Sequence, residues 1–210
     1  ADDTVGDLQI SKKVKNDRTD SKFDDEQFDF DISLYETVTD DDGTETKKPV
    51  TGGYKYTIKG AGTDDEQTVT FDKDGKATVS LKDGQAIVIK DLPASAKYEV
   101  TENAASCWKV SSSKDGAGYT DSSTVKGSIP EPDKDGNKHK SSTSYQNTYE
   151  PSPASVKLSA EKKFNAWNDE GLQTEFFDMR LTAVENTGSG DINETMTEKN
   201  KKFDEVIAKD

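Results

Sequence analysis

Apolar and polar residues alternate with a period of two along much of the chain before residue 150. The clearest runs cover residues 28–34, 54–58, 68–71, 76–81 and 85–89. Successive side chains of a strand point to opposite faces, so this pattern predicts strands that each bury one face. Helical periodicity is absent from these runs. Short strands at this spacing predict an all-β fold, either an antiparallel sandwich or an open barrel.

Two Asp-Gly dipeptides punctuate these runs. Asp83-Gly84 separates residues 76–81 from residues 85–89, and Asp74-Gly75 stands just before residue 76. An Asp-Gly pair between alternating runs favours a type I′ turn, because that turn needs positive φ at its centre. We therefore expect both dipeptides to close β-hairpins.

Three further alternating segments each carry one polar residue in their apolar phase. The in-phase sets are Leu8, Ile10, Lys12 and Val14; Tyr98, Val100 and Glu102; and Tyr145, Asn147 and Tyr149. An amine, a carboxyl and a carboxamide are thus expected to point toward one core. A buried lysine is costly unless another group uses it. We hypothesise a self-formed amide bond between Lys12 and Asn147, assisted by Glu102.

Amide formation from these groups needs three conditions. Burial lowers the pKa of a lysine and supplies the neutral amine that attacks. A protonated glutamic acid can donate a hydrogen bond to the asparagine oxygen, and it can shuttle the proton that lets ammonia leave. Folding holds the atoms in contact, which can remove roughly 7–11 kcal/mol of the barrier. Because the reaction happens once per molecule, no enzyme with turnover is expected.

Each assignment has a competitor in the sequence. Lys13 is the alternative inward lysine, although Lys12 keeps phase with its apolar neighbours. Glu99 is the competing carboxyl, on the opposite face of its segment. Asn103 competes with Asn147, but it lies where a loop is expected. The simplest alternative for all three positions is a solvated side chain at the surface or at a strand end.

Composition and charge narrow the classes of partner. The chain has 28 Lys and Arg against 42 Asp and Glu, a net charge of −14. Nucleic acid is therefore not expected, because phosphate binding needs a cationic face. The single cysteine, Cys107, excludes an internal disulfide and is expected to be half-buried. His139 has no other metal ligands around it, so no metal or cofactor is expected, and no apolar stretch is long enough to span a membrane.

The composition changes after the alternating runs. Residues 111–144 are rich in Ser, Gly, Asp and Lys, which predicts long loops with weak edge strands. Residues 150–153 contain two prolines and predict a stiff, extended linker. We expect a first domain at residues 1–150 and a second domain at residues 151–210.

The second domain is expected to resemble the first. Residues 156–164 repeat the pattern of residues 8–14, and residues 177–181 repeat that of residues 28–34. Residues 202–207 form one more candidate strand. No counterpart of the later strands follows, so the second copy is expected to be truncated, or else to be a smaller, divergent domain.

The order of these segments resembles the Cna B-type and streptococcal pilin isopeptide-linkage domains of Gram-positive surface proteins. The resemblance is carried by residues 70–93 and 97–102, by the opening Ser11-Lys12 and by the closing residues 147–149. It implies an immunoglobulin-like antiparallel sandwich. In such domains a lysine of the first strand bonds to an asparagine of the last strand, next to a catalytic acid.

Residue by residue, the resemblance implies Lys12 and Asn147 as the cross-linked pair and Glu102 as the acid. The matching lysine of the second copy is Lys162, which is expected to stay unlinked because its acid and asparagine are missing. Such domains usually place a Gly-aromatic pair after the catalytic strand, where this chain has Cys-Trp. A different local loop is therefore expected there.

The resemblance also implies a function. The expected role is a structural module of a bacterial cell-surface stalk, pilus or adhesin, located outside the cell and anchored to the cell wall. Its expected partners are neighbouring domains of the same protein, with sortase-linked subunits or a host ligand as further candidates. The alternative is an adhesin domain that recognises a host protein or glycan through residues 111–144. An extracellular hydrolase is a third class, which no arrangement of catalytic residues favours.

Overall fold

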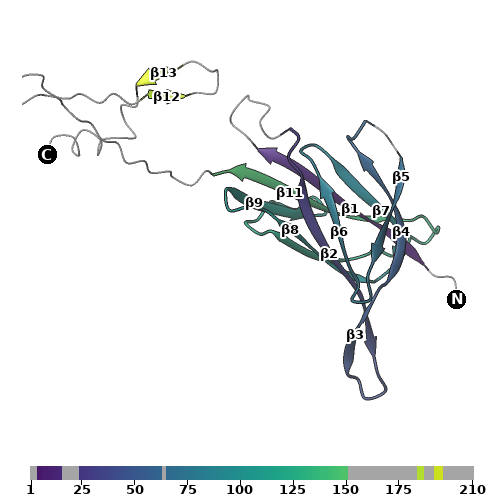
Figure 1. Ribbon diagram of the computed structural model, residues 1–210. Helices are drawn as coiled ribbons and strands as arrows, with labels where there is room; N and C mark the ends of the chain where they lie inside the picture. The colour runs from purple at the N-terminus through teal and green to yellow at the C-terminus, as the bar shows by residue number, and fades with distance from the viewer. Residues whose placement is uncertain (1–3, 16–23, 63–64, 151–183, 187–191, 196–210) are drawn as a thin grey trace, which may run out of the picture. The chain divides into compact units, whose positions relative to one another are not determined.

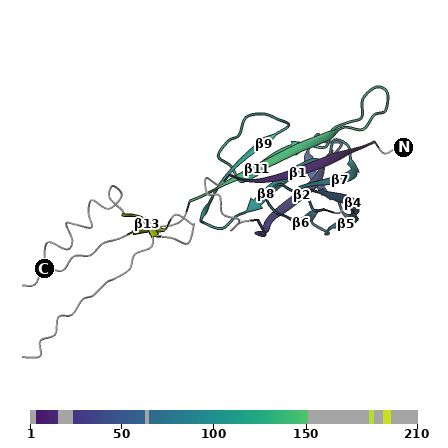
Figure 2. The same ribbon diagram turned by 90° about the horizontal axis from the view of Figure 1, so that it is seen from above.

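Two β-sheets pack face to face in the part of the chain before residue 150 (Figures 1 and 2). The computed structural model describes residues 4–15, 24–62, 65–150, 184–186 and 192–195. The chain divides into two compact units, Ala1–Ser152 and Pro153–Asp210. Every regular element among the described residues is a strand, so the predicted all-β sandwich is confirmed.

The first sheet has six strands in the order β5-β4-β7-β1-β11-β9. Their bounds are Glu66–Phe71 for β5, Gly52–Lys59 for β4, Ala86–Pro93 for β7, Val5–Lys15 for β1, Lys140–Tyr149 for β11 and Trp108–Lys114 for β9. The edge strands are β5 and β9, and the first and last strands of the unit lie in the interior of the sheet.

The second sheet has five strands, of which the long β2 is the central one. Their bounds are Thr124–Ser128 for β10, Lys97–Asn103 for β8, Phe28–Thr39 for β2, Glu45–Pro49 for β3 and Lys76–Leu81 for β6. The order is β10-β8-β2, and β2 pairs on its other side with β6 along its first half and with β3 along its second half. The β2–β3 hairpin projects from the sandwich (Figure 1).

The strands pair antiparallel, as expected, with one exception. Strands β1 and β11 run parallel and side by side, with Lys12 opposite Tyr145 and Val14 opposite Asn147 (Figures 1 and 2). The chain therefore enters β1 at one end of the sandwich and leaves β11 at the other. Parallel neighbours need a long connection, which the rest of the unit supplies.

The core lies between the sheets and is built from the inward phase of each run. Apolar side chains of both sheets alternate into it, and the most enclosed are Phe30, Phe71, Leu8, Ile10, Ile32, Leu34, Leu81, Ile87, Ile89 and Leu92. Two tyrosines are buried with them. The Tyr98 hydroxyl bonds to Ser141 Oγ at 2.7 Å, and the Tyr145 hydroxyl donates to the Val100 carbonyl at 2.6 Å. Both polar groups are thereby satisfied inside the core.

The prediction that both Asp-Gly dipeptides close β-hairpins is wrong. Strands β5 and β7 belong to the first sheet and β6 belongs to the second, so neither dipeptide joins paired strands. Both dipeptides do form tight turns, with positive φ at Gly75 and Gly84. A local turn signal reverses the chain, but it does not decide whether the next strand pairs or crosses to the facing sheet. Here each turn is a corner between the sheets.

The remaining predictions fall on the loops and on the second unit. Strands β9 and β10 are edge strands within residues 111–144 or adjoining them, as expected. Residues 140–144 were expected in the same region of loops and edge strands, but they begin β11, which is an interior strand. In the second unit β12 (Val184–Asn186) pairs antiparallel with β13 (Ile192–Thr195). The strands predicted at 156–164, 177–181 and 202–207, and Lys162 itself, lie outside the described residues. No helix in the described ranges has the length and apolar character of a membrane span.

Candidate functional site

Lys12, Glu102 and Asn147 meet between the two sheets. Each occupies an inward position of its strand, Lys12 on β1, Glu102 on β8 and Asn147 on β11, and all three are buried. Lys12 Nζ lies 2.7 Å from Glu102 Oε1, and Asn147 Nδ2 donates to the same oxygen. Because both nitrogens bond to one atom, they lie within two hydrogen-bond lengths of each other, about 6 Å at most.

The competing residues lie elsewhere. The Lys13 side chain is 65% exposed and sits 3.8 Å from Asp83, on the outer face. Asn103 donates to Asp31 Oδ2 at 2.6 Å, also on the outside. Glu99 lines an outer groove of the second sheet. The alternation of β1 and β8 therefore separates the buried lysine and acid from their neighbours in sequence.

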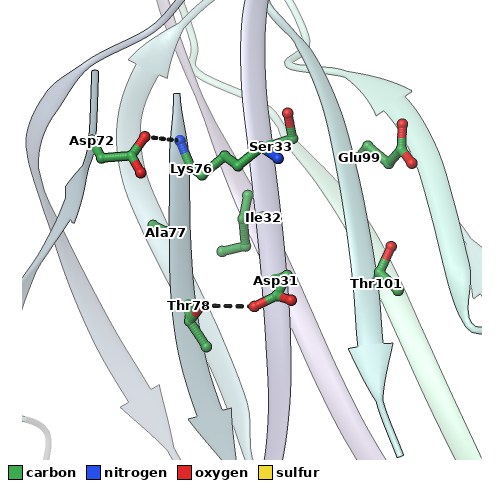
Figure 3. A pocket seen from close by; sticks show the side chains of 9 residues that line it. All are labelled: Asp31, Ile32, Ser33, Asp72, Lys76, Ala77, Thr78, Glu99 and Thr101. Carbon is green, nitrogen blue, oxygen red and sulfur yellow. Dashed lines mark hydrogen bonds between the residues drawn. The ribbon is translucent and has the colours of Figure 1, made fainter. Parts of the chain in front are cut away.

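The outer groove has a volume of about 590 Å3 and crosses strands β6, β2 and β8. Figure 3 shows Glu99 and Thr101 on its β8 side, with Asp31 bonded to Thr78 across the β2–β6 pair. The hydrogen bonds from Thr78 and Asn103 hold the pKa of Asp31 below its usual value. These residues face away from the core, so this groove is separate from the buried group.

The ammonium of Lys12 lies over an aromatic ring. The centroid of the Phe28 ring lies 4.0 Å from Lys12 Nζ, close enough for a cation–π contact. Trp108 packs edge-on against Phe28 and against Tyr149, with ring centroids 5.4 Å apart in each pair. The sequence analysis did not assign these rings to the site. The inward phase of residues 28–34 could have indicated Phe28, whereas the position of Trp108 depends on the pairing of β9 with β11.

Burial changes the chemistry of Lys12. Removal from water lowers the pKa of Lys12 from 10.5 to about 8, against the opposing effects of its hydrogen bond to Glu102 and of the charges on Glu102, Asp83 and Glu26. A depressed pKa makes the neutral amine accessible near neutral pH.

Two buried oxygens of the site have no hydrogen-bond partner among the described residues. They are Glu102 Oε2 and Asn147 Oδ1. An amide oxygen is always a hydrogen-bond acceptor, and the oxygens of an ionised glutamate are acceptors too, so these two atoms cannot bond to each other while Glu102 is ionised. Leaving a buried acceptor unpaired costs about 1–3 kcal/mol. A proton on the Glu102 carboxyl, donated to the carboxamide oxygen, would satisfy both residues at once. The same hydrogen bond would draw electron density from the carboxamide carbon.

The other candidate residues lie outside this group. Cys107 is half-buried against the core, and its carbonyl accepts from the Glu150 amide at 2.7 Å. His139 is exposed, with Nε2 3.6 Å from Asp133. Within the described part of the chain, no three His, Cys, Asp or Glu side chains gather as a metal site requires.

Comparison with known proteins identifies the family. The model of a family described as a domain of unknown function (DUF7601) matches residues 6–149, more than half of the 210 residues. The chain belongs to this family. The match covers the two-sheet sandwich and includes Lys12, Glu102 and Asn147.

Relatives of the DUF7601 domain include a pilus protein. The pilus tip adhesin Cpa of Streptococcus pyogenes is 36% identical over 124 residues, which make up 59% of this chain and 15% of the adhesin. The chain thus spans only a small part of that relative. This relationship confirms the resemblance to Gram-positive pilus and surface proteins that the sequence indicated.

Solved structures give two further matches. The pilus-presented adhesin Cpa aligns with a TM-score of 0.49 and 21% identity, covering 71% of this chain and 28% of that one. The major pilin of Streptococcus pyogenes aligns with a TM-score of 0.47 and 20% identity, covering 70% of this chain and 48% of that one.

The depressed pKa of Lys12 predicts a pH-dependent stability in a chain that cannot form the amide. In the Asn147→Ala variant, the unfolded chain keeps its lysine proton up to pH 10.5 while the folded chain loses it near pH 8. The unfolded state binds more protons in that window, so the free energy of unfolding should rise with pH, by about 3 kcal/mol between pH 8 and 10.5. Urea denaturation across this range measures the effect.

The control for this experiment is the double variant Lys12→Met/Asn147→Ala, which lacks the titrating group. Other lysines and tyrosines titrate equally in both chains, so only the difference between the two curves reports Lys12. Curves that run parallel from pH 8 to 10.5 would show that Lys12 has no depressed pKa.

Proposed function

We propose that residues 1–150 form a structural module of a bacterial cell-surface stalk, pilus or adhesin that cross-links itself through an amide bond between Lys12 and Asn147. Glu102 is the acid that promotes the reaction. One observation carries this proposal: the amine and the carboxamide bond to a single oxygen of Glu102 inside the sandwich.

The proposed reaction has a balanced set of steps. The ammonium of Lys12 gives a proton to Glu102, and the carboxamide of Asn147 turns so that its oxygen accepts from the protonated acid. The neutral Nζ attacks Cγ, and Glu102 passes its proton to the departing nitrogen. The Glu102 carboxylate then takes the second proton that Nζ loses. The Cγ–Nδ2 bond breaks, the Nζ–Cγ bond forms, and one ammonia leaves. Holding the groups in contact replaces the activation that an external catalyst would supply.

The bond would strengthen the unit in two ways. It closes a loop of 147 − 12 = 135 residues, which restricts the unfolded chain by about 5 kcal/mol if treated as a disulfide of that span. It also joins the two parallel strands through which the chain enters and leaves. A pull on both ends then passes from β1 to β11 through the bond, and the residues between Lys12 and Asn147 carry little of the load.

The cell-surface setting rests on the relationship to the pilus tip adhesin and on chemistry. A chain with one cysteine has no internal disulfide. Extracellular proteins are often stabilised by disulfides, so a location outside the cell favours another covalent cross-link, here one that reducing agents do not break. The proposed partners are neighbouring domains of the same surface protein and, through them, other subunits of a pilus. The proposed location is the outer face of a Gram-positive cell wall.

The mass of the intact, purified chain tests the cross-link. We expect the parent chain to be lighter than its sequence by one ammonia, because the reaction expels the nitrogen of Asn147. Lys12→Met, Glu102→Gln and Asn147→Ala each remove one participant, so each variant should keep its full calculated mass. Electrospray mass spectrometry under denaturing conditions distinguishes the two states.

Matched neighbours serve as controls for each participant. Lys13→Met and Glu99→Gln change the same residue types at exposed or partly exposed positions of the same strands, and Asn103→Ala changes an exposed asparagine of β8. All three variants should lose ammonia like the parent. A parent chain with the full calculated mass would remove the proposal. Loss of ammonia that persists in Lys12→Met would assign the bond to another lysine.

The cross-link also predicts a difference in thermal stability. Lys12→Met keeps an apolar side chain of similar length in the core but cannot form the bond. We expect its melting temperature to fall by roughly 10–20 °C, since about 5 kcal/mol of chain restriction is lost. Differential scanning calorimetry of Lys12→Met and Lys13→Met measures this. Equal melting temperatures would mean that the bond contributes nothing to stability.

Ligand binding through residues 111–144 is a second candidate function, and one observation favours it. Tyr119 is 51% exposed on a loop that is fastened at both ends. Ser112 and Thr120 exchange two backbone hydrogen bonds of 2.9 Å, and Asp115 bonds to Ser142 through its amide and its carboxylate. A rigid loop that presents a tyrosine is a common form of recognition surface.

An array of host matrix proteins and glycans tests this second function on the whole chain. We expect any captured ligand to be lost in Tyr119→Ala and kept in Val38→Ala, because Val38 is the other large apolar residue exposed in the described region and lies on the β2–β3 hairpin. Binding that survives Tyr119→Ala would place the ligand elsewhere on the chain.

A further inference from the structure

The turn between β6 and β7 lies against the part of β1 that carries Lys12. The ladder between β1 and β7 ends with the pair Ser11 and Ala86. Beyond it, Lys12 donates to the Gln85 carbonyl at 2.9 Å, and the Gly84 amide donates to the Lys12 carbonyl at 3.0 Å. Both backbone polar groups of Lys12 are thus held by turn residues and not by a strand.

The side chain of Asp83 extends this contact by one more step. Its Oδ1 accepts a hydrogen bond of 2.7 Å from the Val14 amide. In the register of β1 with β11, Val14 is the residue directly opposite Asn147. Asp83 therefore fixes the β1 residue that faces the asparagine, while Gly84 and Gln85 fix the residue that carries the amine.

The turn can do this because it is a corner between sheets. In a hairpin, the residues of the turn would project beyond two paired strands. Here β6 lies in the second sheet, so the turn crosses from that sheet and meets β1 where β7 has not yet begun. Gly84 supports the sharp reversal with a φ of 77°, which a residue with a side chain adopts only under strain.

We propose that Asp83 is a positioning residue for the Lys12–Asn147 reaction, acting as a backbone acceptor that sets the alignment of β1 on β11. This role rests on the proposed cross-link. The reaction needs the amine and the carboxamide carbon in near-contact, and a misplacement of about 1 Å can slow such a step by roughly 100-fold. A clamp on Lys12 and Val14 supplies this alignment from the side opposite β11.

The charge of Asp83 works against the reaction. It is one of the charges that raise the pKa of Lys12 and so favour the unreactive ammonium. A carboxylate at this position helps as a hydrogen-bond acceptor and hinders as an anion. Two substitutions separate these effects: Asp83→Asn keeps an acceptor oxygen without the charge, and Asp83→Glu keeps the charge but moves the oxygen by one methylene.

The test follows bond formation in the whole chain over time. Each variant is synthesised in vitro with a short pulse of isotopically labelled lysine and is quenched in denaturant at increasing times. The fraction that has lost one ammonia gives the rate. The control is Asp72→Ala, because Asp72 Oδ1 accepts backbone hydrogen bonds from Asp74 and Lys76 in the β5–β6 turn. That turn is also a corner between the sheets.

We expect Asp83→Ala and Asp83→Glu to form the bond about tenfold more slowly than the parent or slower still. Asp83→Asn should match the parent or exceed it, and Asp72→Ala should match the parent whatever its stability. A second readout is independent of the bond. In a Lys12→Met background, hydrogen exchange at the Val14 amide should be faster with Asp83→Glu and unchanged with Asp83→Asn.

Three results would overturn this role. Asp83→Glu at the parent's rate shows that the position of the acceptor is unimportant, and this variant decides the matter even if Asp83→Ala fails to fold. Asp83→Asn as slow as Asp83→Ala shows that an acceptor oxygen at this position is not sufficient. A parent chain that keeps its ammonia overturns the proposed cross-link itself, whereas linkage in the parent with equal rates in all Asp83 variants overturns only the positioning role.

Discussion

A lysine enclosed between two sheets must obtain from neighbouring side chains the hydrogen bonds and the charge stabilisation that water would otherwise supply. Lys12 has Glu102 and the face of Phe28 for this purpose, and Asn147 bonds to the same oxygen of Glu102. Lys138 provides a contrast in the same unit. It lies 2.8 Å from Asp91 and 3.0 Å from Asp7 at the surface, and these carboxylates raise its pKa. Similar partners thus produce a stable ammonium where solvent is near and an accessible amine where it is excluded.

The topology of the unit follows from the same requirement. The lysine and the asparagine come from the first and last strands of the unit, which lie side by side as a parallel pair, so the chain enters and leaves at opposite ends of the sandwich. The acid comes from the facing sheet, so the site exists only when both sheets have packed. Folding is therefore the event that brings the three side chains together. The Phe28 ring contacts the Lys12 ammonium, and the corner turn at Asp83 bonds to the backbone of Lys12 and Val14.

Much of this arrangement can be predicted from the sequence, since a strand with one buried face leaves a period of two. Lys12, Glu102 and Asn147 were identified because each is a polar residue in an apolar phase. The pairing of strands leaves no such local trace. Asp83-Gly84 indicated a turn correctly, but the crossing to the other sheet depends on distant contacts of β6 with β2. The contribution of Asp83 was hidden for that reason, as were the contacts of Phe28 and Trp108.

Tandem mass spectrometry of a proteolytic digest tests the central claim most directly. A branched peptide should appear in which the segment containing Lys12 is joined to the segment containing Asn147, at a combined mass reduced by one ammonia. Fragment ions should place the junction on these two side chains and leave Lys13 unmodified. Recovery of both segments only as separate, unmodified linear peptides would contradict the account.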